Sequence, residues 1–208
     1  MIKVDPPSWK SLWAGRQARR RWLIYWLWEV PVDGLQWLLF HLLGLLPITF
    51  VSNFGARCPR IVVPLLHRDA IERTLTNLRW LKPSWDDARL HRACMYHFET
   101  IGRLQAEFSI LHRLMPSGRI AVENAELAKK TLAAGPVILI GTHIGNWETV
   151  SPVMKSFGVP LCAVFEPQPS YMQTRLALQV RARCSVEGGE AFPRGANALR
   201  TAVRWLHD

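Results

Sequence analysis

A histidine and a glutamate lie five positions apart in the segment 141–148, which has the sequence GTHIGNWE. A histidine oriented by a carboxylate can act as a general base at neutral pH. In such a dyad Glu148 holds one imidazole nitrogen of His143, and the other nitrogen removes a proton from an acceptor hydroxyl, so no serine or cysteine nucleophile is required. We interpret the two residues as a candidate catalytic pair. A structural His–Glu pair at a turn is the alternative.

The elements around this pair must bring the two side chains together, because on one continuous helix their spacing would place them on different faces. The apolar run Val137–Ile140 predicts a buried strand before the motif, and a helix is expected over Trp147–Phe157. A histidine that follows a strand and precedes a helix is typical of the sites that open α/β sheets build. Gly141 and Gly145 relax the backbone of the turn. Glu148 then lies in the first helical turn, where the helix dipole favours an anion.

Short strands separated by helices continue from residue 119 onwards. This alternation predicts an α/β fold with a mixed or parallel sheet. The other expected elements are strands at Ile120–Val122 and Pro160–Phe165 and helices at 124–132 (capped by Asn124), Tyr171–Cys184 and 196–207.

The part of the chain before residue 119 has helical patterns. Apolar residues recur at helical spacing within residues 67–82, and Pro83 ends that helix. Ser84 and Asp87 then resemble a capping box, with a hydroxyl first and a carboxylate three residues later. We expect a long helix from there to about Met115.

The N-terminal residues suggest contact with a membrane. Residues 1–21 are basic and are expected to be poorly ordered, and the apolar residues 22–56 are expected to be broken near Pro31 and Pro47. Within them, residues 35–51 form a run of 17 without acidic or Lys/Arg side chains, at the lower limit for spanning a bilayer. Arginines on both sides suit a segment that lies in, or dips into, the cytoplasmic leaflet. A buried helical hairpin is the alternative.

Composition agrees with a lipid partner. The chain has 208 residues, a formal net charge of +10 and ten tryptophans, a residue type that favours membrane–water interfaces. Because the basic residues flank apolar, Trp-rich sequence and no nucleic-acid motif is visible, we favour anionic lipid over nucleic acid. We therefore expect a membrane-anchoring segment at 1–56 and an α/β domain at 57–208.

The cysteines and histidines give no sign of a metal site. The four cysteines fit neither a CxxC motif nor a dense disulfide framework, and the seven histidines form no ligand cluster. Free thiols in a reducing compartment are expected, which places the catalytic part on the cytosolic side.

The residues His143 to Glu148 (HIGNWE) closely resemble the HxxxxE motif of the bacterial lipid A biosynthesis acyltransferases, within the lysophospholipid acyltransferase superfamily. The resemblance covers about residues 20–208. It includes an apolar N-terminal anchor, a long helix, the glycine-flanked run Gly135–Gly141, the segment Pro160–Pro167 (PLCAVFEP) and a helix that contains an arginine.

This resemblance implies acyl transfer from an acyl-carrier-protein or CoA thioester to a hydroxyl of a lipid A or glycolipid precursor, with no cofactor. His143 would be the base and Glu148 its orienter. Arg181 best matches the functional arginine of the family, with Arg175 and Arg183 as rivals, and Asn146 is a second candidate for substrate binding. The implied partners are acyl carrier protein and a membrane lipid acceptor. The implied location is the cytoplasmic side of the bacterial inner membrane.

The C-terminus departs from the family pattern, because family members typically continue beyond the equivalent of residue 208 with further strands. A truncated chain is therefore expected, with an incomplete sheet, exposed apolar edges and an incomplete acceptor site. Two other functions stay open. One is a non-catalytic, membrane-associated remnant of the family, and the other is an unrelated basic module that binds lipid or nucleic acid.

Overall fold

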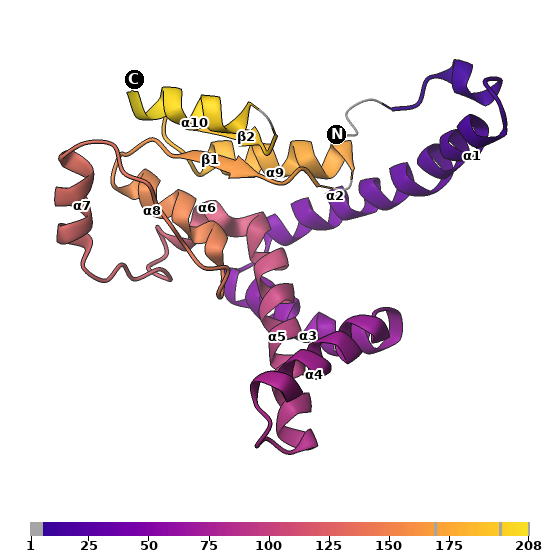
Figure 1. Cartoon of the computed structure of the whole chain (residues 1–208), viewed down its shortest axis with the longest axis horizontal. Helices are drawn as coiled ribbons and strands as arrows, with labels where there is room; N and C mark the ends of the chain where they lie inside the picture. The colour runs from indigo at the N-terminus through magenta and orange to yellow at the C-terminus, as the bar shows by residue number, and fades with distance from the viewer. Residues whose placement is uncertain (1–5, 169, 196, 208) are drawn as a thin grey trace.

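The computed structural model describes residues 6–168, 170–195 and 197–207, and most of them are helical (Figure 1). The elements before residue 119 are η1 (Trp9–Leu12), α1 (Arg16–Ile24), a π-helical stretch η2 (Tyr25–Glu29), α2 (Val30–Leu45), α3 (Ile48–Leu66), α4 (Arg68–Leu81), α5 (Asp87–Glu107), η3 (Phe108–Ile110) and α6 (Leu111–Leu114). The later elements are α7 (Ala125–Ala133), η4 (Trp147–Thr149), α8 (Val150–Ser156), β1 (Cys162–Phe165), α9 (Tyr171–Arg183), β2 (Glu190–Pro193) and α10 (Ala198–His207).

The helices α1 and α2 form one long rod that extends away from the rest of the molecule (Figure 1). The predicted break near Pro31 is wrong. Proline cannot donate a backbone hydrogen bond to the preceding turn, but here it follows a π-helical stretch, in which the Val30 amide reaches back to the Tyr25 carbonyl. The wider turn lets the helix pass through the proline. The predicted break near Pro47 is confirmed, since Leu46 is extended and α3 begins at Ile48.

The expectation of poor order before residue 22 is wrong for the residues that the structure describes, while residues 1–5 lie outside them. The Trp9 ring packs against Trp22 at 4.9 Å and against Trp26 at 6.3 Å between ring centroids. The Nε of Arg19 also donates to the Leu12 carbonyl at 3.0 Å. These contacts fold η1 back onto α1, which composition alone did not reveal.

The helices α3, α4 and α5 form a second arm (Figure 1). The helix predicted within residues 67–82 is confirmed as α4. Ser84 is not the cap of α5, because the side chain of Asp86 accepts from the Arg89 amide at 2.6 Å. The long helix expected to reach Met115 tightens after Glu107 into η3 and continues as α6. At that point the Ser109 hydroxyl donates to the Ala106 carbonyl at 2.7 Å and so competes with the helical ladder.

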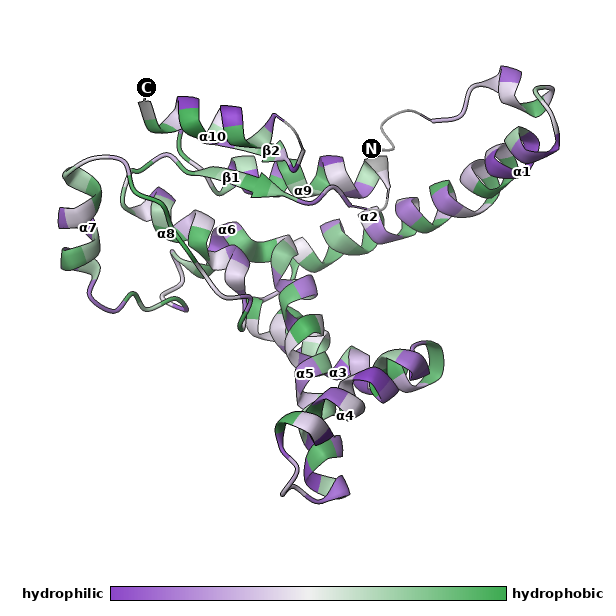
Figure 2. Ribbon diagram, viewed as in Figure 1, coloured by the Kyte–Doolittle hydropathy of each residue, from purple (hydrophilic) through white to green (hydrophobic). Residues whose placement is uncertain are grey.

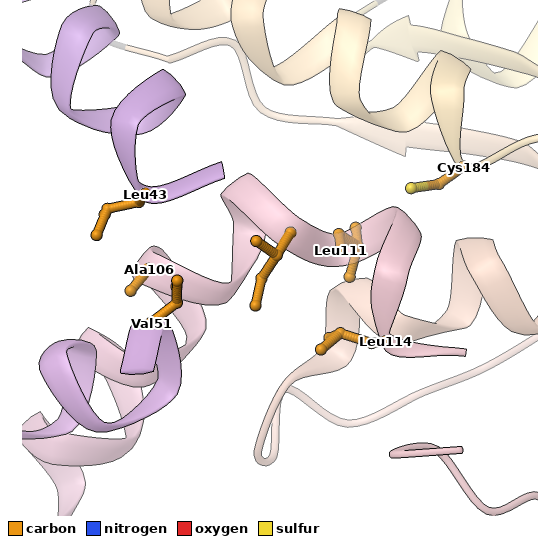
Figure 3. Close-up of a cluster of buried hydrophobic side chains, with 7 residues drawn as sticks. Leu43, Val51, Ala106, Leu111, Leu114 and Cys184 are labelled. Atoms are coloured by element: carbon orange, nitrogen blue, oxygen red, sulfur yellow. The ribbon is translucent and has the colours of Figure 1, made fainter. Parts of the chain in front are cut away.

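The main core lies where the two arms meet the C-terminal part (Figure 3). It joins residues from α2, α3, α5, η3, α6 and the end of α9, which are Leu43, Val51, Ala106, Ile110, Leu111, Leu114 and Cys184. The C-terminal end of α2 is fixed here by Arg113, whose Nη1 donates to the Gly44 and Leu46 carbonyls at 3.0 and 2.8 Å. The expected boundary between residues 56 and 57 falls inside α3.

The sheet consists, within the described residues, of two parallel strands, β1 and β2, which α9 connects. The strand predicted at Pro160–Phe165 and the helices at Tyr171–Cys184 and 196–207 are confirmed within one or two residues at most boundaries. Strand β2 was not predicted. It is only four residues long and ends in a proline.

Two predicted strands are wrong, so the α/β expectation holds only for a small sheet in a mostly helical chain. Neither Ile120–Val122 nor Val137–Ile140 pairs with another strand among the described residues. The second segment is extended, and Ile140 is 94% exposed. An apolar run predicts burial, but a strand also needs a partner for its backbone, and that partner is not encoded in the run itself.

None of the helices in the described ranges combines the length and the apolar character needed to cross a bilayer.

Candidate active site

The motif segment forms a turn that ends in a short helix. Gly145 has a φ of +61°, a left-handed conformation that glycine adopts readily. Asn146 then starts η4, because its carbonyl accepts from both the amide and the hydroxyl of Thr149, at 3.2 and 2.7 Å. These two hydrogen bonds to one carbonyl oxygen fix the helical turn that carries Glu148.

Glu148 pairs with Arg181 of α9 rather than with His143. Arg181 Nη2 donates to Glu148 Oε1 at 2.7 Å and Arg181 Nε donates to Oε2 at 3.2 Å, which is a two-pronged arrangement. The two side chains are only 19% and 14% exposed. The Arg181 guanidinium also lies over the Phe165 ring of β1, 5.6 Å from its centroid. The pair therefore connects the motif turn to α9 and the sheet.

Of the three candidate arginines, Arg181 is the one that contacts the motif. Arg175 and Arg183 are exposed, and neither has a side-chain hydrogen bond or ion pair among the described residues. The sequence left open which of the three arginines faces the motif, and the structure places Arg181 there. The functional role of Arg181 stays a prediction.

His143 lies on the exposed side of the turn. Its ring packs on Trp147, with 4.7 Å between centroids and an interplanar angle of 57°. The hydrogen bonds of the described residues include none between His143 and Glu148. The structure therefore brings Glu148 and Arg181 together, and it leaves the imidazole exposed beside Trp147.

Asn146 is held by a residue that the sequence analysis missed. Its Nδ2 donates to Glu107 Oε2 at 2.9 Å, and the other oxygen of Glu107 accepts from the hydroxyl of Ser52 on α3. A signal did exist, because Glu107 shares a helical face with the buried residues Leu104 and Ile110. A carboxylate at such a position needs polar partners.

A groove of about 1600 Å³ lies beside the motif turn. Its walls come from α2, the end of α5, the extended residues 137–139, β1, α9 and α10. The lining is more apolar than polar, and His143, Asn146, Glu148 and Arg181 are among its polar side chains. A concave apolar site with a few convergent polar groups is the usual form of a small-molecule or lipid site.

A polar bridge ties the two long walls of this groove together. Gln173 of α9 donates from its Nε2 to Asp33 Oδ1 at 3.0 Å and to Gln36 Oε1 at 2.7 Å, both on α2. Asp33 is buried at this bridge. The bridge fixes the position of α2 beside α9, so the N-terminal rod is part of the groove.

The thiols and imidazoles nearby offer no second nucleophile or metal site. All four cysteines are free, and burial raises the pKa of Cys94, Cys162 and Cys184, which keeps these thiols protonated. Burial lowers the pKa of His112, and the neighbouring Arg183, Arg113 and Lys155 lower it further. No group of three potential metal ligands is found in the part of the chain that the structure describes.

Comparison with known proteins agrees with the motif. The family model of bacterial lipid A biosynthesis acyltransferases matches residues 14–208. No curated protein and no solved structure matches the chain. The family match covers the N-terminal rod, the helical arm, the motif turn and the α/β part alike. The chain therefore belongs to the bacterial lipid A biosynthesis acyltransferase family.

Proposed function

We propose that this protein transfers a fatty acyl chain from an acyl-carrier-protein or CoA thioester to a hydroxyl of a lipid A or glycolipid precursor. Family membership supports acyl transfer in general. The observation that carries the finer proposal is the position of His143 and Glu148 on a turn that borders a large, mainly apolar groove. Such a groove suits an acyl chain, and the turn supplies a base beside it.

In the proposed reaction, His143 removes the proton from the acceptor hydroxyl as its oxygen attacks the thioester carbonyl. The tetrahedral intermediate then collapses, the carbon–sulfur bond breaks, and the imidazolium returns the proton to the departing thiolate. Ester and free thiol are the products, so atoms and charges balance without a cofactor.

Glu148 can orient His143 even while Arg181 is bound to the Glu148 carboxylate. A carboxylate has about four lone-pair positions, and Arg181 occupies two of them. In the mechanism we propose, the exposed His143 ring turns away from Trp147 and donates to a free lone pair of Glu148. Arg181 fixes the carboxylate and adds positive charge near the developing oxyanion. Asn146 is proposed to bind the substrate.

Helix α2 supports a location at the membrane surface. One of its faces lines the groove with Asp33, Gln36, Phe40 and Leu43. Other residues at the same 3-4-3 spacing are exposed and apolar, and these are Leu35, Leu38, Leu42 and Leu45. We propose that this outer face lies in the cytoplasmic leaflet of the bacterial inner membrane, with the groove directly behind it.

The positive charge of the chain supports two anionic partners, the acidic acyl carrier protein and a phosphorylated lipid acceptor. Complementary charge would speed the encounter with both and would favour them over neutral lipids.

The direct test is acyl transfer from an acyl-carrier-protein thioester to a tetraacylated lipid A precursor in detergent. We expect His143→Ala to abolish transfer, because His143 is the only imidazole on the turn and the Glu148 carboxylate is held by Arg181. His91→Ala, an exposed histidine on α5, is the matched control and should keep the parental rate. Transfer that survives His143→Ala would refute the proposed base.

A non-catalytic, membrane-associated role is the second candidate. Two observations favour it, namely the absence of a His143–Glu148 hydrogen bond among the described residues and the unpaired segment at Val137–Ile140. Vesicle binding by the parent, with no acyl transfer to any hydroxyl acceptor from either thioester donor, would select this role.

A further inference from the structure

We infer that Glu107 is a positioning residue that anchors the motif turn to the helical arm; this inference rests on the proposed function for its catalytic consequence. Glu107 is the last residue of α5 and is separated from Ser52 and Asn146 by 55 and 39 residues. One of its carboxylate oxygens accepts from the Ser52 hydroxyl, and the other accepts from the Asn146 side-chain amide. One carboxylate thus connects α3, α5 and the turn that carries His143 and Glu148.

The chemistry of the cluster makes this connection specific. A carboxylate accepts hydrogen bonds only, so the amide nitrogen of Asn146, and not its oxygen, must face Glu107. Ser52 is 4% exposed, and Glu107 takes part in no ion pair of the described residues. The charge of Glu107 is therefore stabilised by two neutral donors. Glu107 itself is half-buried, and a carboxylate partly withdrawn from water is costly unless such donors are held in place.

The fixed Asn146 transmits this anchoring to the candidate catalytic residues. Its side chain is held by Glu107, and its carbonyl holds the Thr149 amide and hydroxyl. Glu148 lies between these two points. His143 lies on the other side of Gly145, whose left-handed φ of +61° sets the direction of the chain. Loss of the Glu107 contact would release the turn while leaving the Arg181 pair intact.

The test uses the 208-residue chain in detergent and exchanges the donor and acceptor of the hydrogen bond between Glu107 and Asn146. Hydrogen–deuterium exchange of the peptide 141–150 reports the turn directly, and the α4 peptide, residues 68–81, reports a helix of the arm away from the turn. We expect Glu107→Ala to speed exchange in 141–150 and not in α4. Glu107→Gln should preserve the parental pattern, because the Ser52 hydroxyl can rotate to accept from the new amide.

The paired variants separate positioning from a general loss of stability. Asn146→Asp alone places two carboxylates against each other and should speed exchange in 141–150. Combining it with Glu107→Gln lets the new amide donate to the new carboxylate, and slow exchange should return. Glu126→Gln, which removes an exposed ion pair with Lys129, is the control and should change neither peptide.

Activity gives the second readout. Glu107→Ala should lower kcat about 10²-fold with KM little changed, the effect of a misplaced reacting group, and Glu107→Gln should retain most of the parental kcat. If no variant and no parent transfers acyl chains, the proposed function fails, while the exchange data still decide the anchoring. Parental exchange in 141–150 after Glu107→Ala would overturn the inference. So would faster exchange that reaches α4 and is not reversed by the double variant.

Discussion

At the scale of single residues, the site is organised by the pairing of Arg181 with Glu148. The guanidinium presents two parallel donors to the two carboxylate oxygens, at 2.7 and 3.2 Å. Only arginine offers this planar fork, because the lysine ammonium is a compact point charge on a flexible stem. The orientation of Glu148, and through it the proposed orientation of His143, therefore depends on arginine in particular and not on positive charge alone.

This dependence gives a prediction for Arg181→Lys. The charge near Glu148 remains, but the two-pronged geometry is lost, so we expect kcat of acyl transfer to fall by about one to two orders of magnitude. The free energy of unfolding should fall by about 1–3 kcal/mol, since one largely buried carboxylate oxygen loses its donor. Steady-state kinetics and urea denaturation measure the two effects. Arg175→Lys on the exposed part of the same helix should change neither, and a parental kcat in Arg181→Lys would contradict the role of the fork.

The motif residues could be predicted from the sequence because their signal is local. His143, Asn146 and Glu148 lie within six consecutive positions, and Arg181 follows in the next helix but one. The helical spacing of Glu107 could have marked it as a carboxylate that needs partners, but its partner could not be found in this way, since the contact with Asn146 spans 39 residues and exists only after α5 has packed beside the turn. The pairing of Glu148 with Arg181 in place of His143 is likewise a result of tertiary structure.

At the scale of elements, α3 and α5 approach each other closely at their crossing. A methyl group added at Gly55 would lie 2.6 Å from both the Ala106 Cβ and the Gly102 carbonyl oxygen. One added at Gly102 would collide with the Pro59 ring and the Gly55 carbonyl. Both glycines are required by this close approach of two backbones. Ser52 of α3 and Glu107 of α5 lie on the two helices of this crossing, so the crossing positions the carboxylate that holds Asn146 of the motif turn.

We therefore expect Gly102→Ala to destabilise the protein by about 1–3 kcal/mol, the usual cost of overpacking, even though alanine is the better helix former. The melting temperature should fall by about 2–4 °C for each kcal/mol. Gly34→Ala in α2 is the matched control, because a methyl group there meets nothing within 4 Å. It should leave stability unchanged or raise it slightly. Equal melting temperatures for the two variants would show that the crossing tolerates separation.

The elements also show which parts of the fold a sequence predicts. Helices α4, α5 and α9 were predicted because their apolar residues and helix-forming character are contained in the segments themselves. The strands at Ile120–Val122 and Val137–Ile140 were predicted wrongly from apolar character alone. A strand is defined by a backbone partner, and each residue of β1 pairs with a residue of β2 that lies 28 positions further along the chain, which no local pattern specifies. The two-residue discrepancy at the cap of α5 has the same origin, because either Ser84 or Asp86 could cap, and only the structure selects Asp86.

At the scale of the whole molecule, the rod of α1 and α2 joins a proposed membrane surface to the groove. Figure 2 shows hydrophobic residues recurring along this rod beyond the body of the protein. Near its start, Arg16, Arg19, Arg20 and Arg21 are exposed. Basic residues beside an exposed apolar face are typical of helices that lie in the interface of an anionic membrane. A lipid acceptor held there would need to move only past α2 to reach the motif turn.

This arrangement predicts binding to vesicles that contain anionic lipid, with affinity that falls as salt is raised, because each arginine near the surface contributes about 1 kcal/mol at most before screening. Replacing Leu38 and Leu42 with serine should weaken binding at least tenfold. Each leucine loses about 1.5–3 kcal/mol of burial, and about 1.4 kcal/mol corresponds to a factor of ten. Neither residue lies in the core cluster, so the melting temperature should stay near that of the parent.

The control for this experiment is Trp80→Ser at the end of α4, on the other arm (Figure 1). Trp80 is 81% exposed, more than either leucine. If any exposed apolar side chain contributed to membrane binding, replacing Trp80 would therefore weaken binding at least as much. If the rod is the membrane-binding element, vesicle sedimentation will separate the Leu38→Ser, Leu42→Ser double variant from Trp80→Ser at every salt concentration. If Trp80→Ser weakens binding equally, the protein does not bind the membrane through one defined face. The groove would then have no fixed orientation toward its lipid acceptor, and the proposed route past α2 would be wrong.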